Sequence, residues 1–195
     1  MKVIGLTGGI GMGKSTAAAA FRRARIPVFD ADAAVHALQA PGGRALSPIN
    51  AAFPGTVVDG RLDRAALREA VLGDPDALRR LEAIIHPMVR AAETAFLARA
   101  RRAGRRLVVL DIPLLLETPG ADRVDLTVVV SAPRAVQIQR VRRRRRMDHA
   151  QIAAIIARQM PDAQKRRVAD LVVRTGLSRH YALRSIRRLI RNLTA

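Results

Sequence analysis

Five short runs of mostly apolar residues alternate along the chain with longer stretches of helical periodicity. The runs are KVIGL (2–6), IPVFDADA (26–33), RLVVLDIP (106–113), VDLTVVVSAP (124–133) and ADLVVRTG (169–176). Near-continuous apolar strands separated by helices are typical of a parallel sheet that is covered on both faces. The pattern therefore predicts an α/β protein with a five-stranded parallel sheet between two layers of helices.

Helical patterns fill the stretches between these runs. Residues 15–24 (STAAAAFRRA) are rich in alanine, the strongest helix former. Residues 62–104 keep helical periodicity, which is broken near 73–75 and disturbed at Pro87. Near the C-terminus, apolar residues recur at helical spacing and predict an amphipathic helix docked on the sheet; they are Leu183, Ile186, Leu189 and Ile190.

The composition limits the possible classes of protein. A chain of 195 residues suits one compact domain, and with 3% aromatic residues its core must be largely aliphatic. The sequence has no cysteine, which excludes disulfides, thiolate catalysis and sulfur-ligated zinc. No apolar run approaches the roughly 20 residues that span a bilayer, and glycines interrupt the first residues too early for a secretory signal. We therefore expect a soluble cytoplasmic protein without a membrane partner.

Positive charge is concentrated in the last third of the chain. The formal net charge is +19, and residues 131–195 hold 17 Lys and Arg against 3 acidic residues. Such a segment predicts contact with polyanions, either nucleic acid or phosphorylated small molecules. Arginines at 142–146 are consecutive, and on a helix five successive side chains face every direction. This run is therefore expected to be solvated or to face anions.

The stretch between the first strand and the first helix carries a phosphate-binding motif. Gly8, Gly13, Lys14 and Ser15 fit G-x-x-x-x-G-K-[ST] in the strand–loop–helix context that the motif requires. In such a loop, backbone N–H groups and the helix N-terminus surround phosphate oxygens. The lysine reaches the β- and γ-phosphates, and the hydroxyl ligates magnesium. The sequence therefore predicts a nucleoside triphosphate site with Mg²⁺ at Ser15.

Acidic residues stand at the predicted ends of two further strands. Asp30 and Asp32 follow the second strand, and Asp111 ends LVVLD. Ligands of open α/β sheets bind outside the carboxyl ends of strands, where a carboxylate can take a proton from an attacking hydroxyl or serve a magnesium ion. We expect Asp32 beside the phosphate loop as the base and Asp111 at the metal. The alternative is a helix cap or a turn residue, and for Asp30 both readings stay open.

Seven stretches, taken together and in order, resemble the dephospho-CoA kinase family across nearly the whole chain. They are GLTGGIGMGKST (5–16), DAD (30–32), LDRAALR (62–68), IIHP (84–87), DIPLLLE (111–117), RQMP (158–161) and ADLVV (169–173). The resemblance implies a single P-loop kinase domain over residues 1–195, with a helical acceptor-binding part at about 60–100 and a short lid at about 138–160. It implies transfer of the ATP γ-phosphoryl group to the ribose 3′-hydroxyl of dephospho-CoA, the last step of coenzyme A biosynthesis.

The resemblance also assigns roles to single residues. It makes Asp32 the base, makes Arg140 a lid arginine that neutralises charge on ATP, and puts Asp30, Arg64, His86 and Leu115 on the acceptor side. It places the triphosphate on the loop residues Gly8, Gly11, Met12, Gly13, Lys14, Ser15 and Thr16.

Structural roles compete for some of these residues. His86 before Pro87 also suits a helix kink. Asp63 and Glu117 also suit helix caps. Asp148 and Gln151 resemble a capping box that starts a helix ending near residue 160.

One segment departs from the family pattern. After ADLVV, many members carry an Asp-Asn pair before a glycine, whereas this chain has Arg174, Thr175 and Gly176. The loop follows the last strand, where adenine packs in similar kinases. A main-chain contact with adenine does not depend on these side chains and survives the change. The residues present do not predict a side-chain contact with adenine.

Three functions of different classes fit the motifs: a metabolic kinase, a nucleic-acid-binding NTPase and a nucleotide-dependent switch. The charge and the basic segment RHYALRSIRRLIRNL (179–193) favour nucleic acid. Only five aromatic residues and no second NTPase core are present, which disfavours it. The DAD acids and the acceptor-side helices disfavour a switch. The kinase is preferred, with the oligomeric state and the choice between ATP and GTP left open.

Overall fold

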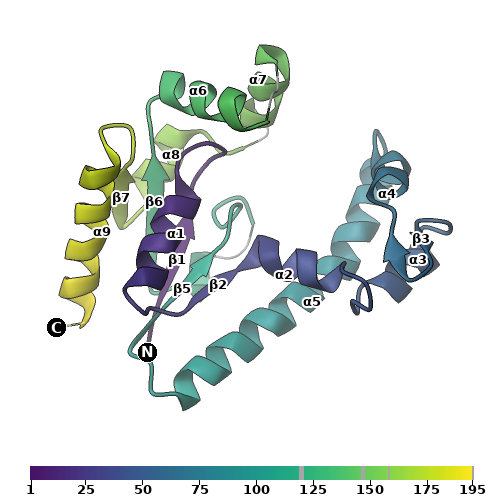
Figure 1. The fold of residues 1–195 in the computed structure, drawn as a ribbon, viewed down its shortest axis with the longest axis horizontal. Coiled ribbons are helices and arrows are strands. Elements are labelled where there is room, and N and C mark those ends of the chain that lie inside the picture. Colours follow the sequence, from purple (N-terminus) through teal and green to yellow (C-terminus); the bar gives the residue numbers. More distant parts are fainter. Residues whose placement is uncertain (119–120, 146–147, 158, 195) are drawn as a thin grey trace. The chain divides into compact units, whose positions relative to one another are not determined.

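The computed structural model describes residues 1–118, 121–145, 148–157 and 159–194 (Figure 1). The chain divides into two compact units, one made of residues 1–29 and 99–195 and the other of residues 30–98. The first unit contains the parallel sheet and the phosphate loop. The second unit is mainly helical and begins earlier than the predicted start near residue 60.

All five predicted strands are present in one parallel sheet. They are β1 (Lys2–Thr7), β2 (Val28–Asp30), β5 (Leu107–Asp111), β6 (Leu126–Ser131) and β7 (Leu171–Arg174). Their order is β2-β5-β1-β6-β7. The second strand does not lie beside the first, because β5 pairs with β1 and separates it from β2.

Helices cover the sheet on both faces, as the apolar strands predicted. On one face, α1 (Lys14–Arg23) and α9 (Arg179–Thr194) pack against each other, and α9 also contacts β7. The predicted apolar stripe of α9 faces this core: Ile186 is 1% exposed, and Leu183, Leu189 and Ile190 pack against the same cluster. On the other side, α8 (Asp162–Val168) contacts β6.

Two further helices belong to the basic segment. They are α6 (Arg134–Arg145) and α7 (His149–Ala157), and they contact each other. The predicted capping box is confirmed, since Asp148 Oδ1 accepts the Gln151 N–H at 2.8 Å and Gln151 Oε1 accepts the Asp148 N–H at 3.2 Å. The helix that this box starts ends at Ala157, and α8 follows as a separate helix that the periodicity did not predict.

The second unit has its own hydrophobic core. It contains α2 (Ala31–Leu38), α3 (Leu46–Ala52), α4 (Arg64–Val71) and most of α5 (Pro75–Arg102). The predicted break near 73–75 is confirmed, and Asp74 caps α5 by accepting the N–H groups of Asp76 and Ala77. Pro87 lies inside α5 and does not end it. The core residues are Leu38, Ala45, Ile49, Phe53, Leu67, Ala77 and Ile85.

A two-stranded hairpin, β3 (Val57–Val58) and β4 (Arg61–Leu62), completes this unit. Its loop is Asp59-Gly60, and both residues have positive φ, 49° and 69°. Such a turn matches the twist of the flanking strands, and Asp-Gly is a preferred sequence for it. The hairpin was not predicted, although this dipeptide is its signal.

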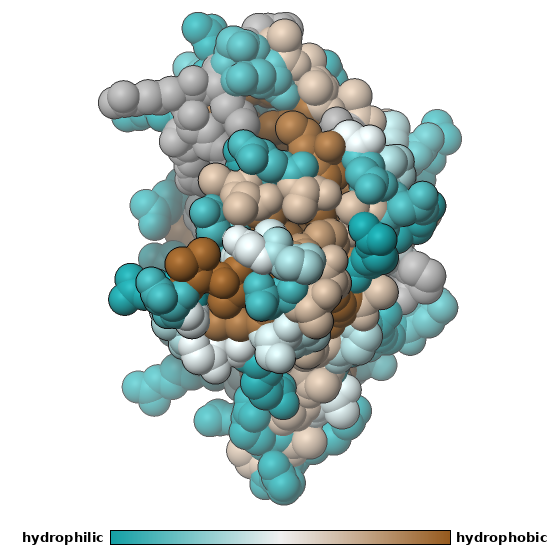
Figure 2. All heavy atoms as spheres, turned by 90° about the vertical axis from the view of Figure 1, so that its right-hand side faces the viewer, coloured by the Kyte–Doolittle hydropathy of each residue, from teal (hydrophilic) through white to brown (hydrophobic). Residues whose placement is uncertain are grey.

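Hydrophilic side chains dominate the outline of the face that Figure 2 displays, as 35 Lys and Arg in 195 residues lead one to expect. None of the helices in the described ranges combines the length and the apolar character that crossing a bilayer requires.

Candidate active site

The phosphate loop connects β1 to α1 and is held close to its neighbours. Gly11 has φ 74°, and a Cβ there would lie 2.8 Å from Val141 Cγ2 and 2.9 Å from the Gln137 carbonyl oxygen. Only glycine fits such a backbone at such a distance. Lys14 begins α1, so the first N–H groups of that helix stay open to an anion at the end of the loop.

Lys14 and Asp111 form an ion pair inside the site. Lys14 Nζ lies 2.7 Å from Asp111 Oδ1, and the two side chains are 16% and 4% exposed. The sheet explains the meeting, because Asp111 is the last residue of β5 and its register partner is Leu6 of β1, just before the loop. The predicted lysine and the predicted strand-end acid are therefore brought together.

Arg140 lies on α6 and is directed to the same loop. Its Nη2 donates to the Thr175 carbonyl at 2.7 Å, and its Nη1 donates to Thr175 Oγ1 at 3.1 Å and the Gly11 carbonyl at 3.4 Å. The guanidinium charge is thus fixed beside the loop by hydrogen bonds. Side chains of the arginine run from position 144, and the whole of Arg146, lie outside the described residues.

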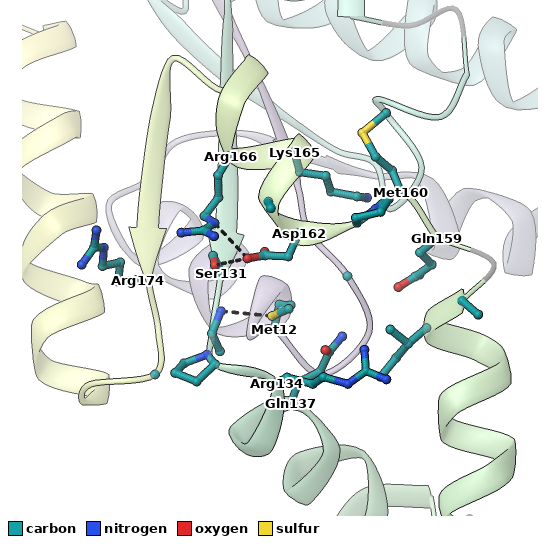
Figure 3. Close-up of a pocket in the computed structure, with 18 of the residues that line it drawn as sticks. Met12, Ser131, Arg134, Gln137, Gln159, Met160, Asp162, Lys165, Arg166 and Arg174 are labelled. Atoms are coloured by element: carbon teal, nitrogen blue, oxygen red, sulfur yellow. Dashed lines mark hydrogen bonds and ion pairs between the residues drawn. The ribbon is translucent and has the colours of Figure 1, made fainter.

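A cavity of about 710 Å³ adjoins the phosphate loop (Figure 3). Gly9 and Met12 of the loop line it, and so do four cationic side chains: Arg134, Lys165, Arg166 and Arg174. Asp162 is the acidic lining residue, and both Ser131 Oγ at 2.8 Å and Arg166 Nε at 3.0 Å contact its Oδ2. The volume is typical of small-molecule sites, and the excess of positive charge suits an anionic ligand.

The second unit holds three of the predicted acceptor-side residues. Asp30 is the N-cap of α2 and accepts the Ala33 N–H at 3.0 Å, so the capping reading is confirmed. Asp32 is the second residue of α2 and is exposed, whereas the sequence placed it at a strand end. Arg64 Nη2 lies 2.9 Å from Nδ1 of His36, which is one turn after Asp32 on α2. The exposed face of α2 therefore carries a carboxylate and a histidine–arginine contact.

His86 and Asp63 have clear structural settings. His86 is exposed on the continuous helix α5, so it does not fill a kink. Asp63 caps α4 through the N–H groups of Ala65 and Ala66.

The turn after β5 contains a buried leucine and an ion-paired glutamate. Leu115 is 0% exposed and packs beneath Gly5, whereas its neighbour Leu114 is exposed. Glu117 is not a helix cap. Its Oε1 lies 2.6 Å from Lys165 Nζ and accepts the Met160 N–H at 3.1 Å. The pair joins this turn to α8.

Several side chains at the site were missed by the sequence reasoning. Gln137, Gln159 and Thr175 hydrogen-bond to the phosphate loop, and His36 contacts Arg64. His36 has a recognisable signal, since it lies four residues after Asp32 on a helix face. Gln137, Gln159 and Thr175 lie far from the loop in the sequence and reach it only because of the order of the strands in the sheet.

The fold and the loop define the class of protein: a P-loop kinase with a separate helical unit. Comparison with known proteins identifies the family. The family model for dephospho-CoA kinase matches residues 2–178. A dephospho-CoA kinase of Paramagnetospirillum magneticum is 62% identical over 166 residues, which cover 85% of this chain and 78% of that protein. One of Gluconobacter oxydans is 53% identical over 197 residues, covering 99% and 98%.

Solved structures share the fold of this chain. TT1252 from Thermus thermophilus has a TM-score of 0.86 and 36% identity, covering 100% of this chain and 98% of its own. Dephospho-CoA kinase from Campylobacter jejuni shares the fold with a TM-score of 0.68 and 19% identity, covering 98% and 97%. The chain belongs to the dephospho-CoA kinase family and is therefore a kinase.

Proposed function

We propose that this chain transfers the γ-phosphoryl group of ATP to the 3′-hydroxyl of the ribose of dephospho-CoA and so completes coenzyme A. The observation that carries the proposal is the phosphate loop with Lys14 paired to Asp111, in a chain of the dephospho-CoA kinase family. The cysteine-free sequence suits the reducing cytoplasm in which we place the reaction.

The triphosphate lies along the loop from Gly8 to Thr16 in this proposal. Backbone N–H groups and the start of α1 bind its oxygens, and Lys14 holds the β- and γ-phosphates. Before ATP arrives, the ion pair with Asp111 keeps Lys14 Nζ at the loop. The cation is therefore in place before the substrate, and little reorganisation is needed when charge moves onto the leaving oxygen.

Arg140 neutralises charge that develops during transfer. Its hydrogen bonds to Thr175 and to the loop hold the guanidinium in one orientation. A fixed cation interacts more strongly with the transition state than with the ground state, and this difference raises kcat. In this proposal the adjoining cavity, of about 710 Å³, receives the adenosine part of the nucleotide.

Asp32 orients the acceptor hydroxyl and takes its proton. A ribose hydroxyl is a weak acid, so it gains from a carboxylate that accepts its proton as the new bond forms. Asp32 is exposed in the first turn of α2 and is thus accessible to substrate. Arg64 and His86, exposed on the same unit, contribute to binding dephospho-CoA.

Mg²⁺ is the metal that accompanies ATP in this proposal. The described residues contain no cluster of three or more His, Cys, Asp or Glu that could hold a metal alone. Mg²⁺ commonly uses one or two protein oxygens together with phosphate oxygens and water, and the Ser15 hydroxyl and the Asp111 carboxylate offer such oxygens. When bound, the ion neutralises charge on the β- and γ-phosphates.

Product analysis tests the proposal directly. Purified protein is incubated with ATP, Mg²⁺ and dephospho-CoA, and in parallel with shikimate or nucleoside monophosphates. We expect a product that matches authentic coenzyme A in mass and retention time, distinct from its 2′-phosphate isomer. Phosphorylation of shikimate or a nucleotide with none of dephospho-CoA would refute it.

A further inference from the structure

The phosphate loop has outward-facing carbonyl groups that must be satisfied. When N–H groups of a loop turn inward to bind an anion, the carbonyls of the same peptides turn away from it. Three consecutive carbonyls each accept from a different side chain. Ile10 O accepts from Gln137 Nε2 at 2.9 Å, Gly11 O from Arg140 Nη1 at 3.4 Å, and Met12 O from Thr175 Oγ1 at 2.5 Å.

Ile10 is held through its N–H as well, which belongs to the preceding peptide unit. Ile10 N donates to Gln159 Oε1 at 3.0 Å. Both carboxamides pack over Gly9, where a Cβ would lie 3.2 Å from Gln159 Oε1 and 3.3 Å from Gln137 Nε2. Residue Ile10 is therefore held by two glutamines that approach the loop from different segments (Figure 3).

Met12 anchors the other side of the loop. Its side chain is 3% exposed, and its sulfur accepts the Ala132 N–H at 3.0 Å. The Thr175 hydroxyl that binds its carbonyl is also buried and lies 3.3 Å from the Ser131 carbonyl. Gln137 is 4% exposed. Buried polar groups of this kind are costly when they lose their partner, so the contacts define one loop conformation.

We propose that Gln137, Gln159 and Thr175 are positioning residues that hold the phosphate loop in its triphosphate-binding conformation before ATP arrives. Gln137 and Gln159 flank the segment 138–158, and both bind Ile10, so the two ends of that segment are tied to one residue of the loop. This inference adds detail to the proposed function. It rests on that function in one respect only, which is that the loop binds a triphosphate.

The physical effect of such positioning is on affinity for phosphate. A loop that is already ordered loses less conformational freedom when the ligand binds. Without its side-chain partners the loop samples other conformations, and binding must select the competent one. ATP and inorganic triphosphate should be affected alike, whereas the affinity for dephospho-CoA should not change.

Shape-conserving variants test this inference. Gln137→Met and Thr175→Val keep the side-chain volume and remove a hydrogen-bond donor. Gln159→Met removes a hydrogen-bond acceptor, and this side chain is less buried than the other two. Calorimetry measures the Kd of ATP and of inorganic triphosphate, and steady-state kinetics separates KM from kcat. Each variant should weaken both ligands by about 5- to 10-fold, the scale of one hydrogen bond. In the two glutamine variants the kcat at saturating ATP should stay within about threefold, because bound phosphate restores the loop. Thr175→Val also removes the oxygen that accepts from Arg140 Nη1, so a lower kcat is expected for that variant.

Matched controls separate positioning from general damage. Gln139 is exposed on the same helix α6, so Gln139→Met should leave the Kd values unchanged. Thr175→Ser keeps the hydroxyl and should restore binding. Gln137→Met and Gln159→Met should be non-additive when combined, because both side chains hold Ile10.

Three results would overturn the inference: unchanged Kd values in folded Gln159→Met and Thr175→Val proteins, an equal loss in Gln139→Met, or no rescue by Thr175→Ser. If the unsubstituted protein makes coenzyme A while these variants bind ATP normally, only the positioning role fails. If it binds triphosphate but makes no coenzyme A, the proposed function fails and the positioning role can still be measured.

Discussion

The phosphate loop and the exposed face of the helical unit are built in opposite ways. At the loop, Lys14 and Met12, together with Arg140 of α6, are each held by hydrogen bonds or an ion pair to other parts of the first unit. In the helical unit, Asp32 and His86 are exposed, and Arg64 contacts His36 on the surface. The phosphate-binding groups are thus ordered in the free protein, while the groups assigned to the acceptor remain open to solvent.

The comparison indicates that the two substrates are bound in different ways. A preformed anion site suits a ligand whose triphosphate is the same in every cycle and whose charge must be neutralised at once. An exposed polar face suits a larger acceptor that supplies many of the contacts itself. Substitutions in the loop should therefore affect chemistry and folding, and those in the helical unit should affect the acceptor.

The largest effect is expected at Lys14. Lys14→Ala removes the cation that holds the β- and γ-phosphates, so kcat should fall by about 10³-fold, the scale for loss of one transition-state contact. Rates of coenzyme A formation measure the loss, and circular dichroism checks the fold. Lys2→Ala, at an exposed position, is the control. Ordinary turnover in a folded Lys14→Ala protein would refute the assignment of the loop.

Breaking the buried ion pair in the first unit should cost stability rather than catalysis. Lys165 is 1% exposed, and Glu117 Oε1 lies 2.6 Å from its Nζ. Glu117→Ala leaves a buried cation without its partner and should lower the free energy of unfolding by about 3 kcal/mol. Denaturant unfolding measures this. Lys165→Met combined with Glu117→Leu should recover part of the loss, and a Glu117→Ala protein of unchanged stability would contradict the prediction.

Asp32→Asn tests the acceptor side. The variant keeps the shape and a hydrogen-bonding oxygen but loses the charge, so kcat should fall by roughly 10²-fold with the Kd of ATP unchanged. Asp59→Asn, on the exposed hairpin turn of the same unit, is the control. A near-normal kcat for Asp32→Asn, with an inactive Asp111→Asn protein, would move the role of base away from Asp32.

Arg64→Ala should sharpen the contrast between the two substrates. Losing a charged hydrogen-bonding group should raise the KM for dephospho-CoA by about 10-fold, while the KM for ATP stays constant. Arg61→Ala, an exposed neighbour on β4, is the matched control. A rise in the KM for ATP instead would show that Arg64 serves the nucleotide.

The smallest effect is expected in the arginine run. Arg143→Gln with Arg145→Gln should change kcat by less than about twofold, since a run of five successive arginines is expected to be mostly solvated and solvated charges contribute little. Arg140→Ala on the same helix should lower kcat clearly, because its contact strengthens in the transition state. Equal losses in the two proteins would show that the run acts as a unit. Salt-sensitive DNA binding without kinase activity would favour the nucleic-acid alternative.

The sheet could be predicted because each strand carries its own local signal. Apolar runs such as LVVLD and LTVVV are buried on both faces, so they need no knowledge of their neighbours to be recognised. The order of the strands has no such signal. No residue near Val28 indicates that β5 would separate β2 from β1.

The candidate site was predictable where a motif fixes the backbone. Lys14 and Asp111 were found because a glycine-rich loop and a strand-end acid are local patterns. The burial of Leu115 could not be predicted locally, because it depends on Gly5, 110 positions earlier in the chain. Thr175 was noticed only as a departure from the family, since its bond to Met12 spans 163 residues. Long-range contacts of this kind leave no trace in local periodicity.

The bond between Met12 and Thr175 has a consequence for biosynthesis. Met12 is made before its partner in this bond, Thr175, which follows 163 residues later. At 5–20 residues per second, roughly 10 to 30 s pass between the two. Strand β1 also lacks its partners at first, because the two strands that pair with it, β5 and β6, begin at Leu107 and Leu126. The phosphate loop of a nascent chain therefore lacks this contact until residue 175 has been made.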